Sequence, residues 1–239
     1  AVSDSDVFIC DGGEQIGNDY VRCAVYPYAH GTETLGEVIQ NSCNDGMMAI
    51  GRKMGAALLL DYQSQFNFGS RTGIDLPNES SGAIYTLDQM KDIELASTTF
   101  GQGFTSTMIQ EISAVSAVIN GGTYYQPHVV KRITDENGNV VQEIQPTLLR
   151  ETISESTSET LRQYMYSTVT SGTGATAKVD GYSMGGKTGT AQKAGRDGVN
   201  YLVSFIGFAP VDDPQLVIYC VVDEPNAVEQ YHSSFAQNI

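Results

Sequence analysis

The stretch GYSMGGKTGT, Gly181–Thr190, decides how the rest of the chain is interpreted, because three short catalytic motifs overlap in it. Gly181–Gly185 fits G-x-S-x-G, the nucleophile elbow of hydrolases that use a serine, an acid and a histidine. Gly181–Thr188 fits G-x-x-x-x-G-K-T, a loop that binds phosphate. Lys187–Gly189 fits K-T-G, an element of some serine acyl-transfer enzymes. The flanking sequence has to distinguish between the three.

The flanks argue against the first two motifs, which need a buried strand before the turn and a helix after it. Thr170–Asp180 is too rich in glycine and polar residues for a buried parallel strand. Gly189, Gly195 and Gly198 disfavour a helix on the other side. The elbow still has candidate triad partners downstream, namely Asp212, Asp223 and His232. The context nevertheless favours K-T-G on a strand.

The last part of the chain predicts three neighbouring strands, at Gly185–Lys193, Tyr201–Ala209 and Leu216–Asp223. The connections between them are short, so we expect the strands to be antiparallel. On such a strand, Lys187 to Thr190 would present a cation, two hydroxyls and open backbone beside Gly189. This set suits a carboxylate and a carbonyl oxygen held at the rim of the strand.

The remaining chain alternates helical patterns with short strands. In the first part of the chain we expect an irregular β segment at Phe8–Tyr28, a helix capped by Thr32, and a helix with Met47, Met48 and Met54 on one face. Further helices are expected at Asp88–Ser97, Thr105–Asn120 and Ser154–Ser171, and a terminal helix should start in Glu229–Ile239. A hairpin is expected to pair Gln126–Thr134 with Val140–Gln145. The pattern predicts one α+β domain over residues 1–239, with an antiparallel sheet flanked by helices.

Charge and hydropathy exclude some classes of partner. Thirteen basic against 28 acidic side chains give a formal net charge of -15, which argues against nucleic acid or an anionic membrane surface as a partner. No apolar run has the length of a membrane span, so we expect no membrane contact by this segment. The opening residues AVSDSDV lack the pattern of a signal peptide, which suggests a piece of something longer or a processed product.

The cysteines allow more than one interpretation. Cys10 and Cys23 flank a short loop, and they could form a disulfide across a hairpin or remain free thiols. A zinc site that adds His30 and Cys43 is conceivable, but no C-x-x-C pair or zinc-finger spacing supports it. The sequence analysis therefore predicts no metal site and no cofactor.

Ser42 and Asn44 are polar residues two positions apart at the expected start of the methionine-rich helix. They are either ordinary helix caps or two groups at the rim of a cleft. In the second interpretation, Ser42 relays a proton and Asn44 offers its amide to a peptide substrate. Cys43 between them is expected to be a small buried residue.

Six stretches together carry a resemblance to a known family. They are HGTETLGEVIQNSCN at His30–Asn44, FGSRTGIDLPNE at Phe68–Glu79, TTFGQG at Thr98–Gly103, INGGTYYQPHVV at Ile119–Val130, GGKTGTAQK at Gly185–Lys193, and FIGFAPVDDPQLVIYCVVDEP at Phe205–Pro225. In this order, they resemble the transpeptidase domain of class B penicillin-binding proteins, most closely the sporulation and cell-division members from Firmicutes. The resemblance implies the fold of penicillin-binding proteins and serine β-lactamases.

The resemblance also implies an activity and the residues that carry it. Members of this family are peptidoglycan D,D-transpeptidases: a serine attacks stem peptides ending in D-Ala-D-Ala, and β-lactam antibiotics acylate the same serine. Ser42 and Asn44 match the catalytic S-x-N element, and Lys187 opens the K-T-G element. Thr188, Gly189 and Thr190 would bind substrate, with the Thr190 N–H as part of an oxyanion hole. The family works on the extracytoplasmic face of the membrane, with division or sporulation partners.

The chain departs from the family pattern at the nucleophile. No lysine here has a serine three positions before it, so the S-x-x-K element is missing. We therefore expect no nucleophile in this chain, a fold incomplete on its N-terminal side, and no acylation of the chain alone. Two alternatives stay open: a non-catalytic interaction domain of the same family, and a β-lactamase or β-lactam sensor of the same fold.

Overall fold

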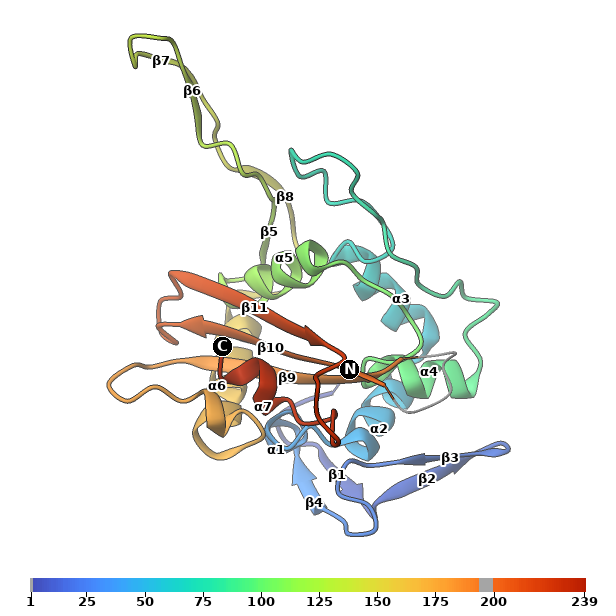
Figure 1. Cartoon of the computed structure of the whole chain (residues 1–239). Coiled ribbons are helices and arrows are strands. Elements are labelled where there is room, and N and C mark those ends of the chain that lie inside the picture. Colours follow the sequence, from blue (N-terminus) through green and yellow to red (C-terminus); the bar gives the residue numbers. More distant parts are fainter. Residues whose placement is uncertain (1, 194–199) are drawn as a thin grey trace.

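A three-stranded antiparallel sheet lies at the centre of the computed structural model, which describes residues 2–193 and 200–239 (Figure 1). Its strands are β9 (Gly185–Gln192), β10 (Tyr201–Ala209) and β11 (Leu216–Asp223), in the order β11-β10-β9. The three predicted strands and their antiparallel arrangement are confirmed. The predicted turn between β9 and β10 falls on residues 194–199, outside the described part of the chain.

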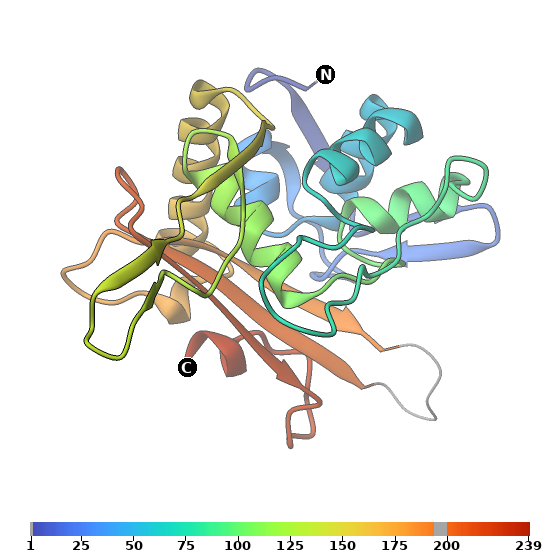
Figure 2. The ribbon, with the colours of Figure 1, turned by 90° about the horizontal axis from the view of Figure 1, so that it is seen from above.

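Helices cover both faces of this sheet. Helices α5 (Met108–Ile119) and α6 (Glu155–Ser171) lie over one face, and the short α7 (Ser234–Gln237) lies against the other (Figure 2). Strand β10 is nearly continuously apolar because it is buried between these layers. Its buried aromatic side chains join two clusters: Phe208 with Ile119 and Met165, and Phe205 with Val169 and Ala236.

The two long helices begin where capping chemistry allows. Thr107 caps α5 in a capping box with Gln110, and the Ser154 hydroxyl accepts the Thr157 N–H at the start of α6. Gln110 is fully buried, and its side-chain amide also donates to three loop carbonyls, those of Asn67, Ser70 and Ser81. One helix residue thus fixes the long loop that contains Asn67, Ser70 and Ser81.

The N-terminal part is built from short elements. Strand β1 (Val7–Cys10) pairs with β4 (Gly31–Thr34), β2 (Gly13–Ile16) pairs with β3 (Asp19–Arg22), and helices α1 (Leu35–Gln40) and α2 (Asn44–Met54) follow. The predicted helix cap at Thr32 is wrong. Residues 31–34 are held in a strand by pairing with β1, and Thr34 caps α1 through a capping box with Glu37.

The middle of the chain forms two helices and an arm. Helices α3 (Ala56–Gln65) and α4 (Asp92–Thr99) lie beside α2, and α4 begins four residues later than predicted. The arm is a pair of ribbons, β5 (Thr123–Gln126) with β8 (Thr147–Glu151) and β6 (Arg132–Thr134) with β7 (Val140–Glu143), and it projects from the body (Figure 1). The predicted hairpin is therefore shorter, because Gln126 belongs to β5 and Pro127 follows without an N–H for pairing. The remaining regular element is a 3-10 turn at Ala175–Ala177.

The α+β class is confirmed by this arrangement of helices on a mostly hairpin-connected sheet. Among the described residues, the longest helix is α6 with 17 residues, and none is long and apolar enough to cross a bilayer.

Candidate active site

The K-T-G residues lie on β9, which is an edge strand of the central sheet. Within residues 2–193 and 200–239, β9 pairs only with β10, so its other edge presents backbone N–H and C=O groups. The strand position excludes both rival motifs, because Lys187 does not open a helix and the turn at Ser183 leads into a strand.

Lys187 and Ser42 are brought into direct contact, although 145 positions separate them. The Lys187 ammonium nitrogen Nζ donates to the Ser42 hydroxyl over 2.7 Å and to the Thr188 carbonyl over 3.0 Å. An ammonium-to-hydroxyl bond of this length is a charge-assisted hydrogen bond, stronger than a neutral one. The first residue of K-T-G and the first residue of S-x-N therefore form one polar site.

Burial of the Lys187 side chain lowers its pKa, so the ammonium group loses its proton more easily. Desolvation lowers the pKa of the ammonium from 10.5 to about 8, because the charged form loses water that the surroundings replace only partly. At neutral pH the side chain still carries its charge. It can nevertheless exchange a proton with Ser42 far more readily than a solvated lysine could.

Ser42 is held in an unusual backbone conformation between α1 and α2. Its φ is +55°, in the left-handed region that residues other than glycine rarely adopt. The Ser42 N–H donates to the Ile39 carbonyl over 3.3 Å, and the next N–H, of Cys43, donates to Val38 over 3.0 Å. These bonds close the end of α1 and turn the Ser42 side chain towards β9. Such conformations are found where surrounding structure fixes them, often at functional sites.

Asn44 is the predicted site residue that the structure does not join to Lys187. It is the first residue of α2, and its side-chain amide donates to the Arg22 carbonyl over 2.9 Å. This contact ties the start of α2 to the end of β3. Cys43, the cap of α2, is fully buried as expected, and its sulfur accepts the Gly46 N–H.

The hydroxyls of Thr188 and Thr190 have partners that the sequence did not indicate. Thr188 Oγ1 lies 2.9 Å from Thr173 Oγ1, and Thr190 Oγ1 donates to the Tyr231 carbonyl over 3.2 Å. The Gln102 amide donates to the Thr190 carbonyl over 3.3 Å. Gln102 belongs to the stretch TTFGQG, to which the sequence assigned no role. Thr173 follows the end of α6, and a search for hydroxyl side chains near helix ends could have found it.

Gly189 is required by the close approach of the neighbouring strand. In the β9–β10 register it stands opposite Ser204, and a Cβ atom at position 189 would lie less than 2.5 Å from the Ser204 hydroxyl oxygen. No side chain larger than hydrogen fits there without displacing Ser204. The glycine of K-T-G thus has a packing reason in this chain.

Comparison with known proteins shows which family has this sequence and fold. A family model described as "Penicillin binding protein transpeptidase domain" matches residues 1–239. The chain belongs to this family. Among curated transpeptidase-family proteins, it is 43% identical to stage V sporulation protein D of Bacillus subtilis over 98% of the chain. It is 32% identical to the penicillin-binding protein PbpB of Mycobacterium tuberculosis over 93% of the chain.

Solved penicillin-binding proteins have the same fold. Penicillin-binding protein 3 of Mycobacterium tuberculosis, complexed with aztreonam, superposes with a TM-score of 0.84 at 31% identity, covering 94% of this chain and 52% of that one. The D,D-transpeptidase domain of a peptidoglycan glycosyltransferase from Eggerthella lenta gives 0.85 at 26% identity, covering 99% of this chain and 59% of that one. The fold expected from the resemblance is confirmed.

The match covers only part of each relative. The chain spans 37% of the Bacillus subtilis protein and 34% of the Mycobacterium tuberculosis protein. Membership in the penicillin-binding transpeptidase family is therefore established for this chain, and the activity of the whole protein is a matter for proposal.

Proposed function

We propose that the protein containing this chain is a peptidoglycan D,D-transpeptidase, and that this chain supplies the side of its active site that binds the stem peptide. The observation that carries the proposal is the 2.7 Å hydrogen bond from Lys187 Nζ to Ser42 Oγ. It joins two family elements that are 145 positions apart at an edge strand, and several relatives are named peptidoglycan D,D-transpeptidases, which supports this activity.

In the proposed reaction, a serine outside these residues attacks the penultimate D-alanyl carbonyl. A carbon–oxygen bond forms, the carbon–nitrogen bond to the terminal D-alanine breaks, and D-alanine leaves with a proton on its amine. The amine of a neighbouring stem peptide then displaces the serine. The residues of this chain move the proton and hold the substrate.

Each site residue has a place in this scheme. Lys187 and Ser42 form the proton relay, which suits a lysine whose pKa is about 8. The Lys187 charge and the hydroxyls of Thr188 and Thr190 receive the terminal carboxylate, beside the backbone of Gly189, which carries no side chain. The Thr190 N–H contributes to an oxyanion hole, and Asn44 orients the substrate amide after releasing Arg22.

The proposal includes the partners and location that the family implies. β-Lactams acylate the serine of the S-x-x-K element, which lies outside these residues. The whole protein acts on the extracytoplasmic face of the membrane and binds division or sporulation proteins. Penicillin-binding protein 3 of Mycobacterium tuberculosis has been solved in complex with aztreonam, which supports the first of these points.

The test is intact-mass analysis after incubation with a fluorescent penicillin. It compares this chain with a longer form of the protein that includes an S-x-x-K segment. We expect one acyl adduct per molecule on the longer form and none on this chain. Replacing the serine of S-x-x-K with alanine in the longer form serves as the matched control.

The other outcomes point to specific alternatives. An adduct on this chain alone would show that the nucleophile is among its 239 residues. No adduct on the longer form would favour a non-catalytic interaction domain. An adduct that forms and hydrolyses rapidly, with release of the opened antibiotic, would favour a β-lactamase.

A further inference from the structure

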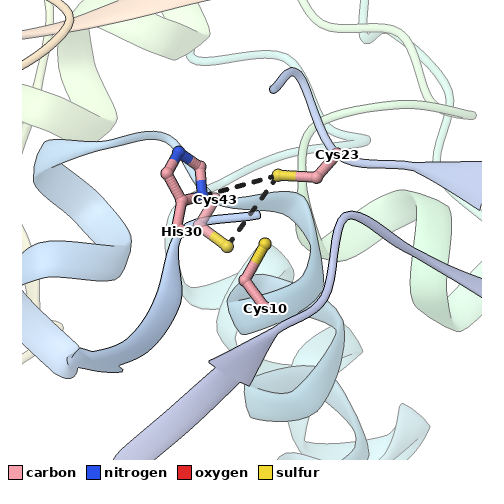
Figure 3. A group of neighbouring side chains, drawn as sticks. All are labelled: Cys10, Cys23, His30 and Cys43. Atoms are coloured by element: carbon pink, nitrogen blue, oxygen red, sulfur yellow. Dashed lines mark hydrogen bonds between the residues drawn. The ribbon is translucent and has the colours of Figure 1, made fainter. Parts of the chain in front are cut away.

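Four side chains from four separate segments meet at Cys43, the middle residue of the S-x-N element (Figure 3). They are the cysteine–histidine cluster: Cys10 at the end of β1, Cys23 after β3, His30 before β4, and Cys43 at the start of α2. One ligating atom from each lies within 4.8 Å of all the others. The three cysteines are buried, and the His30 side chain is 14% exposed.

The spacing of these atoms suits a single metal ion. Cys23 Sγ lies 3.9 Å from Cys43 Sγ and 3.7 Å from His30 Nδ1. In a tetrahedral zinc site with bonds of about 2.3 Å to sulfur and about 2.0 Å to nitrogen, neighbouring ligand atoms are roughly 3.5–3.8 Å apart. A disulfide would instead need two sulfurs at about 2.05 Å, and all four cysteines of the chain are free.

Two buried carboxylates lie beside the cluster, and each has one oxygen that accepts a hydrogen bond, from the Asn41 amide to Glu33 and from the Gly12 N–H to Asp45. Glu33 Oε2 and Asp45 Oδ1 are inaccessible to solvent and accept no hydrogen bond, although both residues are at least 95% buried. Glu33 Oε2 lies 3.7 Å from His30 Nδ1, the ring nitrogen that faces the thiols. Three thiolates outweigh the charge of one divalent ion, so the spacing of the four ligands, and not these carboxylates, supports a metal here.

We propose that Cys10, Cys23, His30 and Cys43 bind one Zn²⁺ ion. Three sulfurs and one imidazole nitrogen form a soft donor set that favours zinc. Four protein ligands leave no open coordination position, so the ion is structural and takes no part in bond breaking. The sequence alone does not support this site, because its ligands have no motif spacing; the fold brings them together from the end of β1, two loop positions and the N-cap of α2.

The ion would position the S-x-N element. Cys43 lies between Ser42 and Asn44, so a bond from its sulfur to zinc fixes the residue that follows the left-handed Ser42. Ligands from β1 and from the segments after β3 and before β4 would then be linked to the start of α2. The binding of zinc is independent of the proposed enzyme activity, while its effect on Ser42 has catalytic meaning only if that activity is present.

The test measures zinc bound to this chain after purification and after titration in competition with a chromogenic chelator. We expect about one zinc per chain. Cys23→Ser and His30→Ala should weaken binding by more than about tenfold, since even the loss of an outer partner costs about 10–100-fold. His30→Cys should retain zinc, because it replaces one ligand with another. The matched control is Cys220→Ser on β11, outside the cluster, which should bind like the unaltered chain.

Cobalt substitution tests the unaltered chain without relying on the folding of a variant. Co²⁺ in this site should give thiolate-to-metal charge-transfer bands and the intense visible bands of a tetrahedral ion. Alkylation in denaturant with chelator and no reductant should modify all four cysteines. A weak octahedral cobalt spectrum, equal zinc binding by Cys23→Ser and Cys220→Ser, or a disulfide that protects two of the clustered thiols would each overturn the proposal.

Discussion

Strand β9 contacts Ser42, and the cysteine–histidine cluster includes the next residue, Cys43. Different kinds of interaction stabilise these two regions. Strand β9 is fixed by continuous backbone pairing with β10, from Gly185 to Gln192. The cysteine–histidine cluster joins four segments through side chains, with only short strands around it. Regular pairing distributes stability over many bonds, whereas the cluster concentrates it on a few atoms. Neighbouring residues of one catalytic element therefore depend on different kinds of interaction.

Removal of zinc should produce the largest difference in stability between strand β9 with its sheet and the region around the cysteine–histidine cluster. Structural zinc sites contribute up to about 10–16 kcal/mol to folding in small domains, so chelation should cut amide protection in β1, β4 and the start of α2 by about a thousandfold or more. Strands β10 and β11 should keep their protection. Hydrogen exchange with mass spectrometry, with and without chelator, measures both regions in one sample. Equal loss in both regions would mean that the cluster and the sheet unfold as one unit.

This contrast explains how much could be predicted from the sequence. The three strands around Lys187 follow from apolar runs and turns, and α6 follows from Ser154, because both signals are local. The cluster was not predicted, because Cys10, Cys23 and His30 converge only once β1 pairs with β4. The family resemblance assigned Lys187 and Ser42 to catalytic elements, but their direct contact was not predicted, since no local signal links positions 145 apart.

Lys187→Met tests the chemistry of β9 with little change of volume. In the longer form of the protein, loss of the buried charge should slow acylation by a fluorescent penicillin by about 10²–10³-fold, comparable to the loss of an oxyanion donor. The exposed Lys178→Met is the matched control and should react normally. An unchanged rate for Lys187→Met would remove this residue from the proposed relay.

Gly189→Ala tests the packing that holds β9 against β10. The new methyl group would collide with the Ser204 hydroxyl, and overpacking of this kind costs about 1–3 kcal/mol. Chemical denaturation of this chain measures the loss. The double variant Gly189→Ala with Ser204→Ala should recover most of it, because the next nearest atom, the Ser204 Cβ, is 3.7 Å away. If the double variant stays as unstable as the single one, the collision is not the cause.

The smallest expected effect is a pH dependence caused by Lys187. Between pH 8 and pH 10.5, the unfolded lysine keeps its proton while the folded one, with a pKa of about 8, releases it. The unfolded state then binds more protons, so the free energy of unfolding rises with pH in this window. Below pH 8 both states are protonated and the group contributes no slope.

Denaturation of the unaltered chain and of Lys187→Met at pH 7.5 and pH 9.5 isolates this contribution, since the other titrating groups are shared. The unaltered chain should gain stability relative to the variant as pH rises. A difference that is constant with pH would mean that the buried lysine has an ordinary pKa, and it would weaken the relay between Lys187 and Ser42.

The free edge of β9 also sets a limit on selectivity. Backbone groups along a strand edge accept any extended peptide, including the same strand of a second molecule. Among the described residues, Gln102 and Tyr231 make hydrogen bonds to β9 at Thr190, three positions from Lys187. In the proposed reaction, discrimination among ligands comes from the Lys187 ammonium and the hydroxyls of Thr188 and Thr190. An anionic end group on a short amide backbone is the minimum that an inhibitor of this site has to carry.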